Sequence, residues 1–281
     1  MSKTIRMSIF QGKTALITGA SRGIGKAIGL KLAAAGCNIV IASKSTEENP
    51  KLGGTIFSAA AEMEALGAQA LPIACDIRFE DQIQHVVEQA AARFGGIDIL
   101  VNNASAISLT PTEQTEPKRY DLMFDINVRG TFMVSRACIP YLKKSTNAHI
   151  LNLSPPLNIQ WKWFKGHLAY TMTKYNMTMI ALGLAEELKE QRIAANTLWP
   201  RTTIATAAVK NLLGGEALMQ MSRTTDIMAD AAFHILSQPA ATCTGRSFLD
   251  EEALTEAGIT DWDQYAVKPG GPLYPDLFVD A

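Results

Sequence analysis

Tyr170 and Lys174 are the residues whose types and spacing most directly suggest chemistry. They lie four apart in a stretch with helical spacing of apolar residues, so both side chains project from one helix face. A phenol with an ordinary pKa of about 10 is a poor acid–base group at neutral pH, but a nearby ammonium favours its ionised form. Lys174 is expected to lower the pKa of Tyr170, which would then exchange protons with a substrate. Tyrosine and lysine also occur at this spacing by chance in many helices, where they form an ordinary half-exposed pair without a catalytic role.

Residues 18–25, Thr-Gly-Ala-Ser-Arg-Gly-Ile-Gly, form a second candidate motif between an expected strand and an expected helix. Gly19 would permit a tight turn, Gly23 would let backbone approach a phosphate, and Gly25 would let the helix pack closely. Glycine also collects in turns for purely backbone reasons. The strand before and the helix after favour binding of a dinucleotide pyrophosphate.

The elements that position these residues alternate along the chain from Lys13 onward. Strands are predicted at Thr14–Thr18, Asn38–Ala42, Ala70–Cys75, Ile97–Val101, His149–Leu153, Ile193–Leu198 and Ser247–Leu249. Helices are predicted at Gly25–Ala35, Thr55–Leu66, Asp81–Phe94, Pro117–Lys144, Leu168–Glu190 and Thr225–Ser237. This alternation predicts an α/β fold, a single Rossmann-like, doubly wound parallel sheet of about seven strands with helices on both faces. We expect one domain over residues 1–281, with an extended tail from about residue 250.

Composition narrows the class of partner. The formal charge of −1 comes from 26 basic and 27 acidic residues mixed along the chain, which argues against nucleic acid or an anionic membrane as a partner. No apolar run reaches roughly 18 residues, so no membrane span is expected. The four cysteines stand far apart without metal-ligand spacing, which predicts reduced, buried thiols and no metal site. A cytoplasmic protein with a small-molecule substrate is expected.

Together these motifs resemble the short-chain dehydrogenase/reductase family. Residues 18–25 match its cofactor turn, and Asn102-Asn103-Ala104-Ser105 is similar to its NNAG motif, with serine in the last position. Asn127 matches the family's asparagine within a helix, although an isolated helical asparagine is otherwise merely tolerated or marks a bend. The resemblance covers nearly the whole chain and includes Tyr-x-x-x-Lys at Tyr170 and Lys174.

The resemblance implies roles for individual residues. Tyr170 would be the proton donor or acceptor, Lys174 would also bond the nicotinamide ribose, and Asn127 would hold a water that links Lys174 to solvent. Asp76 would lie against the adenine, although it could equally be an N-cap or turn residue. The implied cofactor-binding set is Gly19, Ser21, Arg22, Gly23, Ile24, Gly25, Lys44, Asp76, Ile77, Asn103, Ala104, Lys174 and Pro200.

The serine that orients the substrate carbonyl in this family has an uncertain counterpart. Ser154 lies sixteen residues before Tyr170, and Pro155 occupies the usual serine position. Either Ser154 turns toward the substrate or a different donor orients the carbonyl. Ser154 could also simply end its strand with a local hydrogen bond.

Local sequence sharpens the resemblance to the hydroxysteroid dehydrogenase-like subgroup. It is carried by Asn152–Pro156, by the aromatic stretch Trp161–Phe164, by Leu198–Thr202 and by Tyr265–Pro269. Some members carry a sterol-carrier domain after the reductase. This chain is expected to stop before one, so we carry over neither a lipid-carrier function nor a steroid substrate.

The residues after the second strand bear on the choice of cofactor. Folds specific for NAD place an acid there, whereas Ala42-Ser43-Lys44 is followed by no acid until Glu47. Lys44 and Arg22 offer positive charge instead, so NADP(H) is expected to be preferred, with NAD(H) possible. A homo-oligomer, dimer or tetramer, is expected through Pro117–Lys144 and Leu168–Glu190.

The predicted function is hydride transfer between NADP(H) and a carbonyl/alcohol pair on an apolar or acyl-type small molecule. One alternative is a catalytically decayed NADP(H)-binding sensor or scaffold protein. Another is an epimerase or dehydratase on the same fold.

Overall fold

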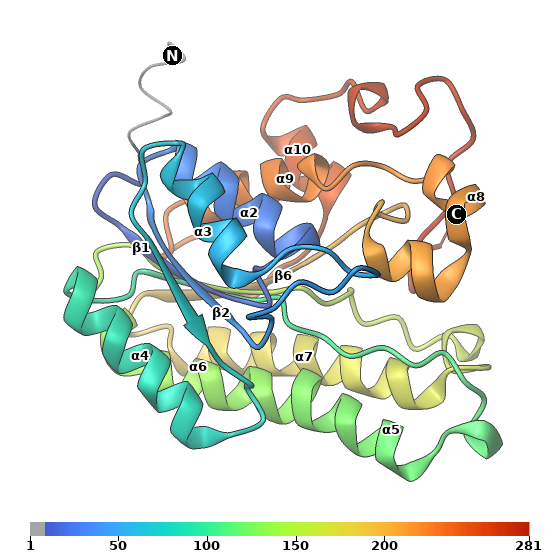
Figure 1. Cartoon of the computed structure of the whole chain (residues 1–281), viewed down its shortest axis with the longest axis horizontal. Coiled ribbons are helices and arrows are strands. Elements are labelled where there is room, and N and C mark those ends of the chain that lie inside the picture. Colours follow the sequence, from blue (N-terminus) through green and yellow to red (C-terminus); the bar gives the residue numbers. More distant parts are fainter. Residues whose placement is uncertain (1–8, 281) are drawn as a thin grey trace.

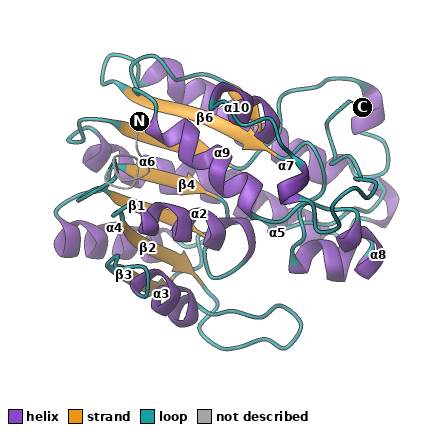
Figure 2. Ribbon diagram, turned by 90° about the horizontal axis from the view of Figure 1, so that it is seen from above, coloured by secondary structure: helices purple, strands orange, loops and turns teal. Residues whose placement is uncertain are grey.

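Seven parallel strands form one sheet in the order β3-β2-β1-β4-β5-β6-β7. This is a computed structural model, and it describes residues 9–280. The strands are β1 Thr14–Thr18, β2 Asn38–Ser43, β3 Ala70–Ala74, β4 Ile99–Asn102, β5 Ala148–Asn152, β6 Ile193–Trp199 and β7 Ser247–Leu249. Figure 2 shows β6, β4, β1, β2 and β3 succeeding one another across the sheet. The predicted fold is confirmed, and each predicted strand lies within two residues of its observed bounds.

Helices cover both faces of the sheet (Figure 1). One face carries α2 Gly23–Ala34, α3 Ile56–Glu64, α9 Asp226–Ser237 and α10 Asp250–Glu256, and the other carries α4 Glu80–Phe94, α5 Pro117–Met123, α6 Thr131–Leu142 and α7 Leu168–Glu187. Successive residues of β1 alternate between the two cores. Ile17 packs in one and Leu16 in the other, as the two-residue period of a strand requires. Burial on both faces explains why the strands read as continuous apolar runs.

The predicted helix Pro117–Lys144 is interrupted. A π-helical segment, η2 Phe124–Gly130, separates α5 from α6, and it contains Asn127. Wide π turns replace one regular turn where a side chain must be re-aimed, and they recur at functional sites. The sequence carries no proline or glycine inside residues 124–129 that would have indicated the change.

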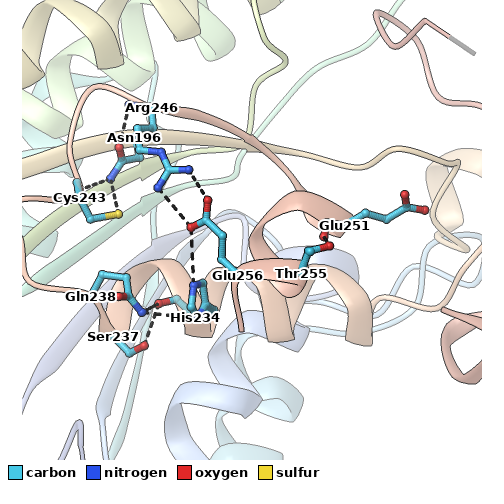
Figure 3. Close-up of polar contacts among 9 residues, drawn as sticks. All are labelled: Asn196, His234, Ser237, Gln238, Cys243, Arg246, Glu251, Thr255 and Glu256. Atoms are coloured by element: carbon cyan, nitrogen blue, oxygen red, sulfur yellow. Dashed lines mark hydrogen bonds and ion pairs between the residues drawn. The ribbon is translucent and has the colours of Figure 1, made fainter. Parts of the chain in front are cut away.

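The segment from Asp250, expected as an extended tail, begins with the helix α10. Figure 3 shows how this helix is tied down, because Glu256 accepts a hydrogen bond of 3.2 Å from Arg246 Nη1 and lies 4.0 Å from His234 Nε2. Arg246 in turn donates its backbone N–H to Asn196 Oδ1 at 2.9 Å, next to β7. After the short turn η5, Asp263–Tyr265, the chain runs to the end of the molecule at which α8, Gly215–Gln220, lies (Figure 1).

Two further expectations can be compared with the structure. The four cysteines are free and buried, as predicted. Among residues 9–280, no helix is both long enough and apolar enough to cross a membrane. The helix α8 and the π turn η4, Val209–Leu213, were not predicted, since both are short and meet at Gly214-Gly215.

Candidate active site

A cleft of about 1190 Å³ opens at the carboxyl ends of the strands. β1 lies between β2 and β4. Strands β2 and β3 follow it toward one edge of the sheet, and strands β4 to β7 follow toward the other edge. Ligands of open α/β sheets bind at such a switch point. Ten of the predicted cofactor residues line the cleft: Gly19, Ser21, Arg22, Gly23, Ile24, Lys44, Asp76, Ile77, Asn103 and Ala104.

The glycine turn is shaped by close backbone approaches. Gly19 has φ +68°, and a Cβ atom on it would lie 2.9 Å from the Cα atom of Ala104. A Cβ atom on Gly25 would lie 2.3 Å from Asn103 Nδ2, and this amide donates to the carbonyl of Gly19 at 3.1 Å. Helix α2 starts at Gly23 with no acidic side chain in its first turn. Its first N–H groups therefore face the cleft as donors for an anion.

Positive charge lies at the β2 side of the cleft. Arg22 donates from Nε to the carbonyl of Gly53 at 2.6 Å and from Nη2 to the carbonyl of Gly54 at 2.8 Å. Lys44 follows β2 directly and is exposed. Both side chains line the cleft, so this end of it is positively charged.

Asp76 is a turn residue, which is one of the roles that were considered for it. Its carboxylate accepts hydrogen bonds from Arg78 Nε at 3.0 Å and Nη2 at 2.6 Å, and from the backbone N–H of Arg78 at 3.2 Å. The hydrogen-bonded guanidinium of Arg78 holds the pKa of Asp76 below its ordinary value. Asp76 therefore shapes a turn, and it also lines the cleft beside Ile77.

Tyr170 and Lys174 are both buried on one face of α7, with exposed fractions of 5% and 3%. Lys174 Nζ donates to the carbonyl of Leu153 at 2.9 Å and lies 5.2 Å from the ring centre of Trp199. Burial lowers the pKa of Lys174 to about 7, and the nearby carboxylate of Asp276 opposes this shift. The ammonium is thus anchored to the end of β5.

The pKa of Tyr170 is displaced in the direction opposite to the sequence expectation. Burial raises the pKa of the phenol, and the negative charge of Asp276 adds to the rise. The physical reason is that residues 276–280 cover the ring, which removes the water that would solvate a phenolate. In this arrangement Tyr170 is a neutral hydroxyl at neutral pH.

Asn127 connects the loop after β4 to α7. Its Oδ1 accepts from the backbone N–H of Ala106 at 2.7 Å, while Nδ2 donates to the carbonyl of Ala106 and to Thr173 Oγ1, each at 2.9 Å. Both amide hydrogens are therefore used within the protein. Oδ1 keeps one lone pair with which a water could be held.

Ser154 is fully buried beside α7. Its hydroxyl shares a hydrogen bond of 2.9 Å with the hydroxyl of Thr178, which also lies 2.6 Å from the carbonyl of Pro155. This hydrogen bond joins α7 to the end of β5 across the fold, whereas the local bond that was one of the sequence interpretations is made by the backbone, from the N–H of Ser154 to the carbonyl of Asn152 at 3.0 Å. Three predicted cofactor residues do not line the cleft. They are Gly25, Lys174 and Pro200, and Pro200 follows β6 and is buried.

Sequence reasoning missed two residues next to Tyr170. Phe278 lies with its ring centre 6.2 Å from that of Tyr170, and Asp276 interacts electrostatically with Tyr170 and Lys174. Both lie in the segment that was expected only as an extension. Nothing in its local composition indicates where it folds back.

Comparison with known proteins gives consistent results. The sequence profile of the family described as short chain dehydrogenase matches residues 13–216. A hydroxysteroid dehydrogenase-like protein 2 from Xenopus tropicalis is 60% identical over 269 residues, which is 96% of this chain and 64% of that protein. The chain therefore spans less than two thirds of the length of this curated relative.

Two solved structures add detail. A putative dehydrogenase from Xanthomonas campestris is 50% identical with a TM-score of 0.94, covering 97% of this chain and 99% of that one. A metagenomic short-chain oxidoreductase in complex with NADP is 25% identical with a TM-score of 0.70, covering 86% of this chain and 97% of that one.

Proposed function

Because this chain belongs to the short-chain dehydrogenase/reductase family, we propose that it transfers hydride between NADP(H) and a carbonyl/alcohol pair on an apolar or acyl-type small molecule. The observation that carries the proposal is the placement of Tyr170 and Lys174. They are buried on one face of α7, where Lys174 contacts the carbonyl of Leu153 at the carboxyl end of β5, and neither side chain lines the glycine-lined cleft itself. Such a pair has no evident structural need for its burial, since burying an ammonium is costly.

The residues of this chain divide the work as follows. Tyr170 donates a proton to the carbonyl oxygen during reduction and accepts it during oxidation. Lys174 places positive charge beside it and bonds the ribose, and Asn127 holds the loop after β4 against α7. The bound nicotinamide supplies or accepts the hydride.

The cleft residues fit the proposed cofactor. Gly19 and Gly25 have no Cβ atoms, which at these positions would clash with Asn103 and Ala104. The backbone N–H groups at the start of α2 are therefore available to bind a pyrophosphate. Arg22 and Lys44 support a preference for NADP(H), with NAD(H) possible, because a 2′-phosphate would meet two cations there. Asp76 and Ile77 would lie beside the adenine.

Ser154 is not assigned the orientation of the substrate carbonyl. Its oxygen accepts from Thr178, and the side chain is fully buried and does not line the cleft, so a different donor would orient the carbonyl. The same observation favours the alternative of a decayed NADP(H)-binding sensor. The complete set of Asn127, Tyr170 and Lys174 favours an enzyme.

We also propose a homo-oligomer of a single-domain, cytoplasmic protein. Phe132 on α6 and Met179 on α7 are 51% and 58% exposed, which leaves apolar surface on the two helices expected to pair. Free, buried cysteines suit a reducing compartment.

A panel of ketones, 3-hydroxyacyl thioesters and steroids tests the function. The purified protein is mixed with each compound and with either cofactor, and the absorbance of the reduced nicotinamide is followed at about 340 nm. A net change that Tyr170→Phe abolishes supports the dehydrogenase. Turnover without net cofactor change would identify an epimerase or dehydratase, and cofactor binding without turnover would favour the sensor.

A further inference from the structure

Residues 276–280 return to the catalytic side of the sheet and cover Tyr170. The indole Nε1 of Trp199, at the end of β6, donates to the carbonyl of Leu277 at 2.8 Å, and the backbone N–H of Asp276 donates to the carbonyl of Arg201 at 3.0 Å. Phe278 is 2% exposed, which is the burial of a core residue. The segment therefore fills space beside the proposed proton donor.

The side chain of Phe278 lies in a cage of five aromatic rings. The distances between ring centres are 5.3 Å to Tyr175, 5.9 Å to Trp163, His167 and Trp199, and 6.2 Å to Tyr170. The cage thus already holds one six-membered apolar ring, placed against the ring of Tyr170. Aromatic walls of this kind bind flat apolar groups with favourable edge and face contacts.

Two observations suggest that Phe278 is not the occupant for which the cage is best suited. Phe278 has φ +72°, in the left-handed region, which a bulky residue adopts only under constraint. The indole Nε1 of Trp163 is buried without a hydrogen-bond acceptor anywhere in residues 9–280. A ligand carrying an oxygen acceptor could satisfy this donor, and a phenylalanine side chain cannot.

The segment is held at its far end by polar contacts rather than by burial. The carboxylate of Asp280 accepts from Asn158 Nδ2 at 2.8 Å and from Gln160 Nε2 at 3.2 Å, and it pairs with Lys162. Asp280 and Lys162 both remain about half exposed. Exposed polar contacts exchange readily with water, so this end of the segment is held less firmly than the buried Phe278 and Val279.

We propose that this five-ring cage is the apolar subsite for the substrate, and that Phe278 is a resident plug which a ligand displaces. The ligand class is a ketone, or the corresponding alcohol, attached to an apolar ring of about the size of a phenyl group. The ring replaces Phe278 in the cage, and the oxygen meets the donors of Trp163 and Tyr170. This inference rests on the proposed function for the role of Tyr170, but its first test requires no turnover.

Indane, a flat apolar ring system without oxygen, tests the plug in the unmodified protein. Hydrogen exchange of the backbone amides of Asp276 and Leu277, both hydrogen-bonded in this structure, is measured with and without saturating indane. Displacement predicts exchange at least about ten-fold faster for these amides and unchanged exchange in α9. Bound indane with fully protected amides would overturn the proposal, and so would the absence of binding.

Variants test the same point by affinity. Phe278→Ala removes the plug, so indane should bind about ten-fold more tightly, because an occupied site reduces the apparent affinity for a competitor. Lys162→Met loosens the hold on Asp280 and should tighten binding by a few-fold, whereas Lys165→Met, a matched change at an exposed lysine three residues away, should not. If Phe278→Ala fails to fold, Phe278→Leu keeps most of the side-chain volume but loses the contacts between aromatic rings, so a smaller gain in indane affinity is expected. Unchanged affinity in the folded variant would contradict the proposal.

The ketone 1-indanone separates this inference from the proposed function. If indane displaces the segment but 1-indanone is never reduced with either cofactor, the function fails while the subsite stands. If 1-indanone is reduced with a KM that Phe278→Ala leaves unchanged, the function stands and the subsite is refuted. We expect reduction with a KM about ten-fold lower in Phe278→Ala.

Discussion

Lys174 donates its hydrogen bond of 2.9 Å to the backbone carbonyl of Leu153, the residue that follows β5, rather than to Tyr170. The ammonium is held at the sheet, where burial lowers its pKa to about 7. A buried amine with so low a pKa is disfavoured in its charged form, so the fold is not stabilised by its charge. The role proposed for Lys174 in catalysis can therefore be tested separately from its effect on stability.

Lys174→Met should therefore lower activity without lowering stability. Methionine keeps the buried apolar stem, and the loss of the bond to Leu153 is offset because no ammonium has to be buried. We expect an unchanged or higher Tm, together with weaker cofactor binding and lower turnover. A protein with unaltered kinetics would exclude Lys174 from the mechanism.

Tyr170→Phe should lower kcat by at least about a hundred-fold, the usual minimum for positioned acid–base catalysis. The ring and its contact with Phe278 are kept, so cofactor affinity and Tm should change little. Tyr141→Phe on α6 serves as the control for loss of a tyrosine hydroxyl. Normal turnover of an authentic substrate by Tyr170→Phe would overturn the mechanism.

Ser154→Ala should have a smaller effect on turnover, less than about ten-fold, because its hydroxyl is already bonded to Thr178. The free energy of unfolding should fall by about 1 kcal/mol, the usual value for a lost buried hydrogen bond. Enzyme kinetics measure the change in turnover, and urea titrations measure the change in the free energy of unfolding, each for Ser154→Ala and the wild type in parallel. A loss of turnover as large as that of Tyr170→Phe would show that Ser154 orients the carbonyl after all.

Arg22→Ala should weaken NADPH binding by about 10- to 100-fold while changing NADH binding by no more than a few-fold. A charge-assisted contact to phosphate contributes about 1.5–3 kcal/mol, and NADH carries no 2′-phosphate. Fluorescence titration with both cofactors measures the ratio, with Arg93→Ala on α4 as an arginine control remote from the cleft. Equal losses for the two cofactors, or equal affinity of the wild type for both, would contradict the NADP(H) preference.

His149 on β5 should make the protein sensitive to mild acid. Burial lowers its pKa from 6.5 to about 4 in the folded state, although its ring bonds the carbonyl of Gln238 at 3.1 Å. Between these two values the unfolded chain binds a proton that the folded chain does not. Stability should therefore be complete above pH 6.5 and decrease by roughly 2–3 kcal/mol as the pH falls toward 4.

Denaturant titrations of His149→Gln from pH 7 to pH 4 test this slope. The variant should lose less stability than the wild type over the same range, and His85→Gln, at an exposed position on α4, should behave like the wild type. The same pH slope in His149→Gln as in the wild type would refute the assignment.

The sequence by itself determined the fold and the glycine turn at residues 18–25. Parallel strands buried on both faces must be apolar throughout, so their positions are visible locally, as at Thr14–Thr18. Gly19 and Gly25 are likewise visible, because close backbone approach admits no side chain. The four-residue spacing of Tyr170 and Lys174 places them on one helix face in any helix.

Only the tertiary structure decided what surrounds that pair. The contact of Phe278 with Tyr170, the enclosure of Ser154 by Thr178 and the π turn at Asn127 all depend on segments that meet across the fold. Local periodicity carries no information about such meetings, because the contact energy appears only once the chain has folded back. Burial, set by the same contacts, then decided that the pKa of Tyr170 rises when the sequence alone had suggested that it falls.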